Sequence, residues 1–173
     1  NSAALLTEPN SHYNMVRPGI ISYGYYPSEE VKRYCLKKNI RLFPVLSLYT
    51  KIVQVKEIRK GDGVSYGSTF IAPKNMKIAV LPVGYYDGID RLLSNAGSMV
   101  IHGKRAKILG RVCMNMTMVD VSDMKNVKAG DTAVIIGKQG KEKMTADEIA
   151  KLSHTINYEV ITRLRESAKR CII

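Results

Sequence analysis

The feature that most constrains the fold is a series of turn-forming clusters that divides the chain from Phe43 onward. Such clusters of Gly, Pro, Asn and Asp separate short strands. The intervening segments are rich in Val, Ile, Met and Thr, which favour strands. Five clusters imply about six strands, and we expect a mainly β domain over residues 39–173. The clusters are Gly61-Asp62-Gly63, Pro73-Lys74-Asn75, His102-Gly103-Lys104, Ala129-Gly130-Asp131 and Gly137-Lys138-Gln139-Gly140.

Two local patterns refine this expectation. Met114, Met116 and Met118 alternate with polar residues at the period of a strand, so we expect a strand whose methionines face the core. Near the end of the chain, Thr145 and Glu148 form a capping box, which predicts the start of a short helix.

The first 38 residues contain one apolar stretch and one amphipathic segment. The stretch from Gly19 to Gly24 lies between Pro18 and Pro27 and predicts one buried strand. Ser28 is a good N-cap for a helix that we expect to end at residues 37–39. One strand and one helix cannot bury a core, so we interpret residues 1–38 as the last part of a larger α/β domain in a longer protein.

Charge and composition limit the class of protein. The 27 basic and 15 acidic residues give a net charge of +12, which favours anionic partners. Nucleic acid is one candidate, but the positive charge is scattered through turns with few aromatic residues interleaved, which favours an ordinary solvated surface. No apolar run approaches the roughly 20 residues of a membrane span.

Cysteine and histidine spacing gives no sign of a disulfide framework or a metal site. Cys35, Cys113 and Cys171 are odd in number and far apart. The three histidines lack the spacing of metal ligands. We therefore expect no metal and reduced thiols in a cytoplasmic protein.

Six short motifs occur in a fixed order along the chain. Taken singly, a tyrosine or arginine in a strand is ordinarily a half-buried amphipathic side chain. Taken together, the succession resembles the alanine racemase family from Asn1 to about Thr162. The motifs are Asn1-Ser2-Ala3-Ala4, Met15-Val16-Arg17-Pro18-Gly19-Ile20, Gly63-Val64-Ser65-Tyr66-Gly67, Pro82-Val83-Gly84-Tyr85-Tyr86-Asp87-Gly88, Gly110-Arg111-Val112-Cys113-Met114 and Thr155-Ile156-Asn157-Tyr158-Glu159.

The resemblance implies a fold and an activity. An eight-stranded α/β barrel of the TIM type binds pyridoxal 5'-phosphate in this family, and a C-terminal β-barrel-like domain contributes to the site of the partner subunit in a homodimer. The present chain is similar to the end of the barrel, residues 1–38, plus the β domain, residues 39–173. The implied reaction interconverts L-alanine and D-alanine and supplies D-alanine for bacterial cell-wall peptidoglycan.

The same resemblance assigns roles to individual residues. Tyr66, which we expect in a strand, matches one of two opposed acid/base groups, because racemisation removes a proton from one face of the substrate and returns it to the other. Arg17 matches the residue that faces the pyridine nitrogen of the cofactor. Ser2, the backbone N–H groups of Gly19 and Ile20, and Tyr158 match positions that anchor the cofactor phosphate.

The substrate-binding residues are implied in the same way. Met114 matches the position whose backbone N–H binds the substrate carboxylate. Tyr85, Arg91 and Arg111 match residues that line the route into the site. The sequence departs from the family pattern at Asn115, where the family usually has Asp, and this puts the charge near the carboxylate in question.

One motif of the family, the one with the lysine that binds the cofactor, is missing from this sequence. The lysine that forms the Schiff base with pyridoxal phosphate belongs to a motif that this sequence does not contain, so we expect these 173 residues alone to be inactive. Three alternatives stay open. The first is a related racemase of serine or another small amino acid, although Tyr158 narrows the pocket and favours alanine. The second is a free-standing basic β-barrel module that binds polyanions, and the third is a domain that serves only in assembly.

Overall fold

A computed structural model describes residues 1–172, and the chain forms two compact units, Asn1–Leu46 and Ser47–Ile173. Residues 40–46 belong to the first unit because Val45 N–H donates to Tyr23 O (3.2 Å) and the Tyr26 hydroxyl donates to Ile40 O (3.0 Å). Within the described residues, no helix has the length and apolar character needed to span a bilayer.

The first unit is helical. The predicted N-cap is confirmed, since Ser28 Oγ accepts a hydrogen bond from Val31 N–H (3.2 Å). The strand predicted from Gly19 to Gly24 is wrong, because this stretch forms a 3₁₀ helix closed by Gly24 at φ 77°. Residues 1–46 contain no strand, so an extended segment from Gly19 to Gly24 would have no strand to pair with and would leave its backbone groups unpaired. The elements are α1 (Ser2–Thr7), η1 (Pro9–Ser11), η2 (Ile20–Tyr23) and α2 (Glu29–Lys37).

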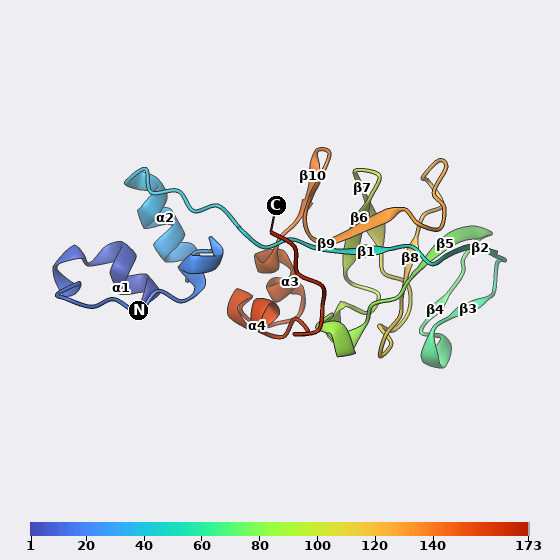
Figure 1. Cartoon of the computed structure of the whole chain (residues 1–173). Helices are drawn as coiled ribbons and strands as arrows, with labels where there is room; N and C mark the ends of the chain where they lie inside the picture. Colours follow the sequence, from blue (N-terminus) through green and yellow to red (C-terminus); the bar gives the residue numbers. More distant parts are fainter. Residues whose placement is uncertain (173) are drawn as a thin grey trace. The chain divides into compact units, whose positions relative to one another are not determined.

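The second unit is built from ten short strands rather than about six, followed by two helices (Figure 1). The excess arises because β3 and β4 have two residues each and β10 has three, too short to show an alternating pattern. The strands are β1 (Leu48–Lys51), β2 (Gln54–Ile58), β3 (Gly63–Val64), β4 (Phe70–Ile71), β5 (Met76–Leu81), β6 (Ser98–Ile101), β7 (Lys104–Lys107), β8 (Thr117–Asp120), β9 (Thr132–Gln139) and β10 (Glu142–Met144).

The strands form three antiparallel sheets, which confirms the mainly β prediction. One sheet has the order β1-β9-β6-β7 with β10 also on β9, the second has the order β2-β5-β8, and the third is the pair β3-β4. A single bridge, Ile108 to Val119, joins the strand region after β7 to β8. Buried Ile58, Val64, Met76 and Leu109 form a core cluster beneath β2, β3 and β5.

Two predicted details of the second unit are wrong. Met114 and Met116 are about half exposed rather than in the core, because β8 begins only at Thr117 and residues 113–116 form a loop closed by Cys113 N–H donating to Met116 O (2.9 Å). Gly137 to Gln139 continue β9 instead of turning, and the turn to β10 begins at Gly140.

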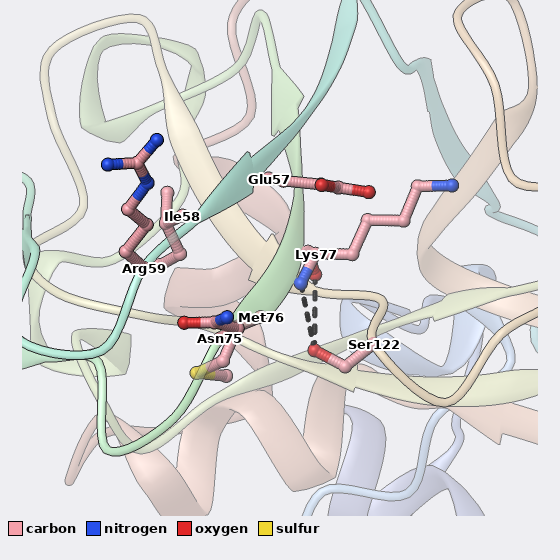
Figure 2. Close-up of a pocket in the computed structure, with 7 residues that line it drawn as sticks. All are labelled: Glu57, Ile58, Arg59, Asn75, Met76, Lys77 and Ser122. Carbon is pink, nitrogen blue, oxygen red and sulfur yellow. Dashed lines mark hydrogen bonds between the residues drawn. The ribbon is translucent and has the colours of Figure 1, made fainter.

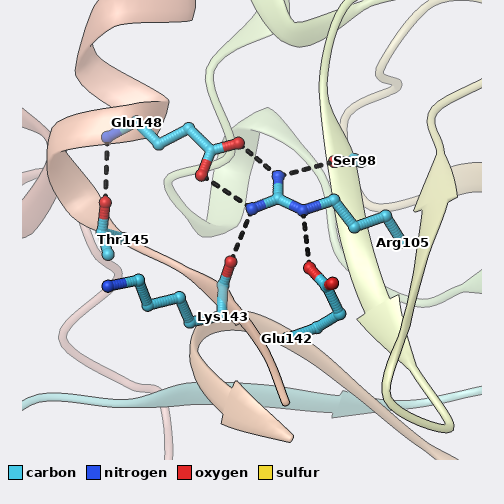
Figure 3. A network of polar contacts seen from close by, with 6 residues as sticks. All are labelled: Ser98, Arg105, Glu142, Lys143, Thr145 and Glu148. Atoms are coloured by element: carbon cyan, nitrogen blue, oxygen red, sulfur yellow. Dashed lines mark hydrogen bonds and ion pairs between the residues drawn. The ribbon is translucent and has the colours of Figure 1, made fainter.

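The helices α3 (Ala146–Leu152) and α4 (Asn157–Thr162) end the unit. Thr145 caps α3 by accepting a hydrogen bond from Glu148 N–H (3.1 Å). The other half of the predicted capping box is absent, because the Glu148 carboxylate pairs with Arg105 of β7 instead (Figure 3). Arg105 also donates to Glu142 (3.1 Å) and to Lys143 O (2.7 Å), so one guanidinium joins β7, β10 and α3. Hydrogen bonding to Glu148 raises the pKa of Arg105 above its ordinary value.

Five 3₁₀-type or loop segments interrupt the strands, and four of them carry predicted site residues. They are η3 (Tyr66–Ser68), η4 (Tyr85–Asp87) and η5 (Arg91–Leu93), together with the loop of residues 108–116 and the loop between β8 and β9. All predicted site residues of this unit except Tyr158, which lies in α4, are therefore on connections between strands, where binding residues are commonly found.

Candidate functional site

Tyr66 lies in a tight turn after β3, not in a strand as predicted. Strand β3 ends at Val64, and the next residues have positive φ angles: Ser65 at φ 66° and ψ −178°, and Gly67 at φ 68°. This backbone turns the Tyr66 side chain outward, and the residue is 72% exposed. An ordinary strand aromatic with its ring in the core is therefore excluded for Tyr66.

The turn of Tyr66 packs against the loop of residues 108–116. Ser65 Oγ donates a hydrogen bond to Arg111 O (2.6 Å) and lies 3.2 Å from Cys113 Sγ. On the other side of Tyr66, a Cβ atom at position 67 would lie 3.0 Å from Arg111 Nη1, so the guanidinium rests directly against Gly67. Arg111 and Tyr66 are thereby held in neighbouring segments.

The loop that carries Tyr85 is joined to the same segment. Tyr85 N–H donates to Cys113 O (3.0 Å), and Tyr86 N–H donates to Met114 O (2.9 Å). Gly84 permits this approach, since a Cβ atom there would lie 2.1 Å from Cys113 O. Both Tyr85 and Met114 are about half exposed.

The segment that carries Arg91 is joined to the loop of residues 108–116 by Ser94. Ser94 Oγ donates to Arg91 O (2.5 Å) and accepts from Val112 N–H (3.0 Å), which ties η5 to the loop of residues 108–116. Tyr85 and Arg91 also line one hollow of about 290 Å³. The structure therefore brings five predicted residues together on interlocked loops: Tyr66, Tyr85, Arg91, Arg111 and Met114.

This arrangement brings together an exposed tyrosine hydroxyl, a backbone amide and positive charge. Among residues 1–172, no acceptor pairs with Met114 N–H, so this amide can bind a ligand oxygen. Arg91 and Arg111 are exposed on the linked segments and favour an anionic ligand. Asn115 adds no negative charge that would oppose a carboxylate.

The predicted cofactor residues of the first unit also lie close together. Ser2 is 5% exposed, and its Oγ accepts a hydrogen bond from Gly19 N–H (2.8 Å). Ser2 keeps a hydroxyl proton to donate, and Ile20 N–H opens the 3₁₀ helix η2 without a partner among the described residues. A hydroxyl and a main-chain donor at one place fit a phosphate group. Arg17 is exposed and lines a hollow of about 190 Å³.

Tyr158 belongs to the second unit. It lies in the first turn of α4, half-buried, and its carbonyl accepts a hydrogen bond from the Thr162 hydroxyl (2.9 Å). The residues predicted to anchor the phosphate are thus divided between the two units, with Ser2, Gly19 and Ile20 in the first unit and Tyr158 in the second.

A hollow of about 610 Å³ on β2 and β5 contains none of the predicted residues (Figure 2). Its polar lining includes Lys77, whose N–H donates to Ser122 Oγ (3.0 Å). Glu57 and Lys77 place opposite charges beside one another there, and no aromatic residue or unpaired buried group marks the hollow as a binding site. The size of the hollow alone therefore does not identify the functional site.

Sequence reasoning missed the residues that hold the site together. Ser65, Gly84, Ser94 and Asn95 connect the loops, and Asn95 does so by accepting from Gly110 N–H (2.7 Å) while its amide contacts Thr69 (3.3 Å). Their partners on the loop of residues 108–116 are 15 to 48 residues away in the chain. Only Gly84 carried a signal, since a glycine beside a predicted site residue suggests close backbone approach.

Comparison with known proteins decides the family. The family described as "Alanine racemase, C-terminal domain" matches residues 45–172. The chain belongs to the alanine racemase family. An alanine racemase of Carboxydothermus hydrogenoformans is 47% identical over 173 residues, which is 100% of this chain and 46% of that protein. An alanine racemase of Leptospira interrogans is 44% identical over 175 residues, 99% of this chain and 45% of that protein.

Solved alanine racemase structures have the same fold. The structure from Bacillus anthracis with bound L-Ala-P has a TM-score of 0.88 and 39% identity, and the match covers 95% of this chain and 41% of that chain. This chain therefore spans less than half the length of the alanine racemases that it matches.

Proposed function

We propose that this chain forms the C-terminal part of a pyridoxal-phosphate-dependent alanine racemase subunit and that Tyr66 is one of its two acid/base groups. The observation that carries the proposal is the exposed Tyr66 held in a strained turn against the loop of Met114. A tyrosine hydroxyl and an unpaired backbone amide on interlocked loops suit proton transfer to a substrate whose carboxylate is fixed.

The residues of the first unit would hold the cofactor. The hydroxyl of Ser2 and the N–H of Ile20 would donate to its phosphate, whereas the N–H of Gly19, also predicted as a donor, is bonded to Ser2 Oγ (2.8 Å). Arg17 would donate a hydrogen bond to the pyridine nitrogen without readily giving up a proton. When bound, pyridoxal phosphate supplies an electron sink for the electron pair left on Cα.

The residues of the second unit would orient the substrate and move the proton. Met114 N–H would bind the carboxylate, and Arg91 and Arg111 would raise the local concentration of an amino-acid anion. Tyr66 would take up or return a proton on one face of Cα. The opposite face requires a second group, the lysine that the family resemblance assigns to a motif outside these 173 residues, so we propose that this chain alone is inactive.

The family resemblance further implies a homodimer in which Tyr66 of one subunit serves the site of its partner. Supporting this, Tyr66, Tyr85, Tyr86, Met114 and Met116 are all between 45% and 72% exposed in this chain, although aromatic and thioether side chains favour burial. A protein surface placed over them would exclude water from the proton-transfer site.

We also propose a cytoplasmic location. The described thiols of Cys35, Cys113 and Cys171 are all free, as expected for a protein in a reducing compartment.

The proposal is tested with the full-length protein that contains this chain, supplied with pyridoxal phosphate. L-alanine should be converted to D-alanine until the enantiomers are equal, and L-serine should give a lower kcat/KM. Faster turnover of serine would indicate the related serine racemase instead. Absence of racemisation, combined with tight and steeply salt-dependent oligonucleotide binding, would indicate the polyanion-binding module.

A further inference from the structure

The residue before Tyr66 adopts a backbone conformation that is unusual for serine. Ser65 has φ 66° and ψ −178°. This combination of positive φ with ψ near 180° is essentially restricted to glycine, and other residues keep it only where the surrounding structure enforces it. Ser65 therefore needs an interaction that holds it in place.

The side chain of Ser65 provides that interaction. Its hydroxyl donates a hydrogen bond to Arg111 O at 2.6 Å, 46 residues along the chain. Ser65 Oγ also lies 3.2 Å from Cys113 Sγ, a contact in which either atom can donate, and the thiol can itself donate to Arg111 O at 3.6 Å. Ser65 is thus bonded to both Arg111 and Cys113, the residues on either side of Val112.

These two bonds fix the spacing between two parts of the proposed site. Tyr66 follows Ser65 directly, and Met114 follows Cys113 directly. Within residues 1–172 the Tyr66 hydroxyl has no hydrogen-bond partner, so the turn itself must set the direction of the hydroxyl. The position of Tyr66 relative to Met114 N–H therefore depends on the Ser65 hydroxyl.

We propose that Ser65 is a positioning residue for the proton transfer: its hydroxyl holds the Tyr66 turn at a set distance from the amide that binds the substrate carboxylate. The inference rests on the proposed function of Tyr66. It adds that a glycine, which suits the backbone at position 65 better than serine, would serve the reaction worse.

The test uses two substitutions in the full-length racemising protein. Ser65→Ala removes the hydroxyl and keeps the strained backbone, whereas Ser65→Gly removes the hydroxyl and relieves the strain. The matched control is Ser122→Ala, which deletes a hydroxyl that donates to Asp120 at 2.6 Å and accepts from Lys77 N–H on another part of the domain.

Both Ser65 variants should lower kcat by about 10- to 100-fold, the range expected when a reacting group is misplaced by up to about 1 Å. KM for alanine should change less than kcat, because the Met114 amide remains. Ser65→Gly should melt at a higher temperature than Ser65→Ala yet be no more active. Exchange of the Cα hydrogen with deuterium should fall at the face that Tyr66 serves and persist at the other face. Ser122→Ala should keep the wild-type kcat.

Two results would overturn the inference: a kcat of either Ser65 variant within threefold of wild type, or an equal loss of exchange at both faces of Cα. The Tyr66→Phe protein separates this failure from failure of the proposed function. If Tyr66→Phe abolishes racemisation while Ser65→Ala and Ser65→Gly retain it, only the positioning role is wrong. If Tyr66→Phe also racemises normally, the assignment of Tyr66 itself is wrong.

Discussion

Replacing Gly84 with alanine should separate the two loops that carry Tyr85 and Met114, the residues that we propose bind or admit the substrate. A Cβ atom at position 84 would lie 2.1 Å from Cys113 O and 2.5 Å from Met114 O. Real Cβ atoms essentially never approach closer than 3.0 Å, and both obstacles are backbone atoms, so the segments must move apart by about 0.9 Å. No flexible side chain can absorb this movement.

The energetic consequence follows from the contacts that are lost. The hydrogen bonds from Tyr85 N–H to Cys113 O (3.0 Å) and from Tyr86 N–H to Met114 O (2.9 Å) would lengthen beyond useful range. Each is worth about 1 kcal/mol, and overpacking adds about 1–3 kcal/mol. We expect Gly84→Ala to lower the free energy of unfolding by roughly 3–5 kcal/mol and to reduce kcat/KM by about 100-fold.

The assay compares racemisation and urea unfolding of the full-length wild type, Gly84→Ala and a control, Gly130→Ala. Position 130 has nothing within 4 Å of an added Cβ, so only its backbone conformation at φ 92° is disfavoured. Gly130→Ala should cost about 1 kcal/mol of stability and no activity. A Gly84→Ala protein with the kcat/KM of wild type would refute the close packing of the two loops.

Two further predictions concern stability. Arg105→Ala should destabilise the 173-residue chain by about 1–3 kcal/mol, since exposed ion pairs contribute little but a charged hydrogen bond to a carbonyl contributes more. In urea unfolding, Arg105→Lys should recover less than half of this lost stability, because an ammonium cannot bind Glu148 with two parallel bonds (Figure 3). Full recovery would contradict the network. The hydrogen bond from Lys128 N–H (2.9 Å), aided by His102, holds the pKa of Asp131 below its usual value. The contribution of the Asp131 carboxylate to stability is therefore complete above the unfolded pKa of about 3.9 and is lost as the pH falls through the folded pKa. The melting temperatures of wild type and Asp131→Asn should converge in acid. A constant difference between them from pH 2 to pH 7 would contradict the prediction.

The sequence predicted the elements whose signals are local. Ser28 and Thr145 cap helices as expected, because an N-cap bonds to the backbone three residues ahead. The His102-Gly103 turn joins β6 and β7, with both residues at positive φ. These features depend on neighbours in sequence, so a single sequence reveals them.

Elements that depend on distant partners were not predictable in the same way. The apolar stretch from Gly19 to Gly24 has the composition of a strand but forms η2, because the unit Asn1–Leu46 contains no strand that could pair with it. Met114 and Met116 follow the strand period, yet their loop is held outward by the hydrogen bond from Tyr86 N–H. Periodicity shows which secondary structure a segment can adopt, whereas the segments it contacts determine which one it adopts.

The candidate site shows the same division. The motif order identified Tyr66, Arg111 and Met114, but nothing in the sequence indicated the left-handed backbone of Ser65 or its bond to Arg111 O across 46 residues. Long-range hydrogen bonds between loops leave no periodic trace in a sequence. The candidate residues could therefore be named from the sequence, whereas the hydrogen bonds that bring their loops together could not.

The most direct test of the account measures hydrogen–deuterium exchange at Cα of L-alanine and of D-alanine separately, in the full-length protein with and without the Tyr66→Phe substitution. Loss of one general acid/base group typically costs about 10²- to 10⁴-fold in rate. The account predicts a loss of this size for one enantiomer, continued exchange for the other, and loss of racemisation. Unchanged exchange for both enantiomers would contradict the role of Tyr66 as a base.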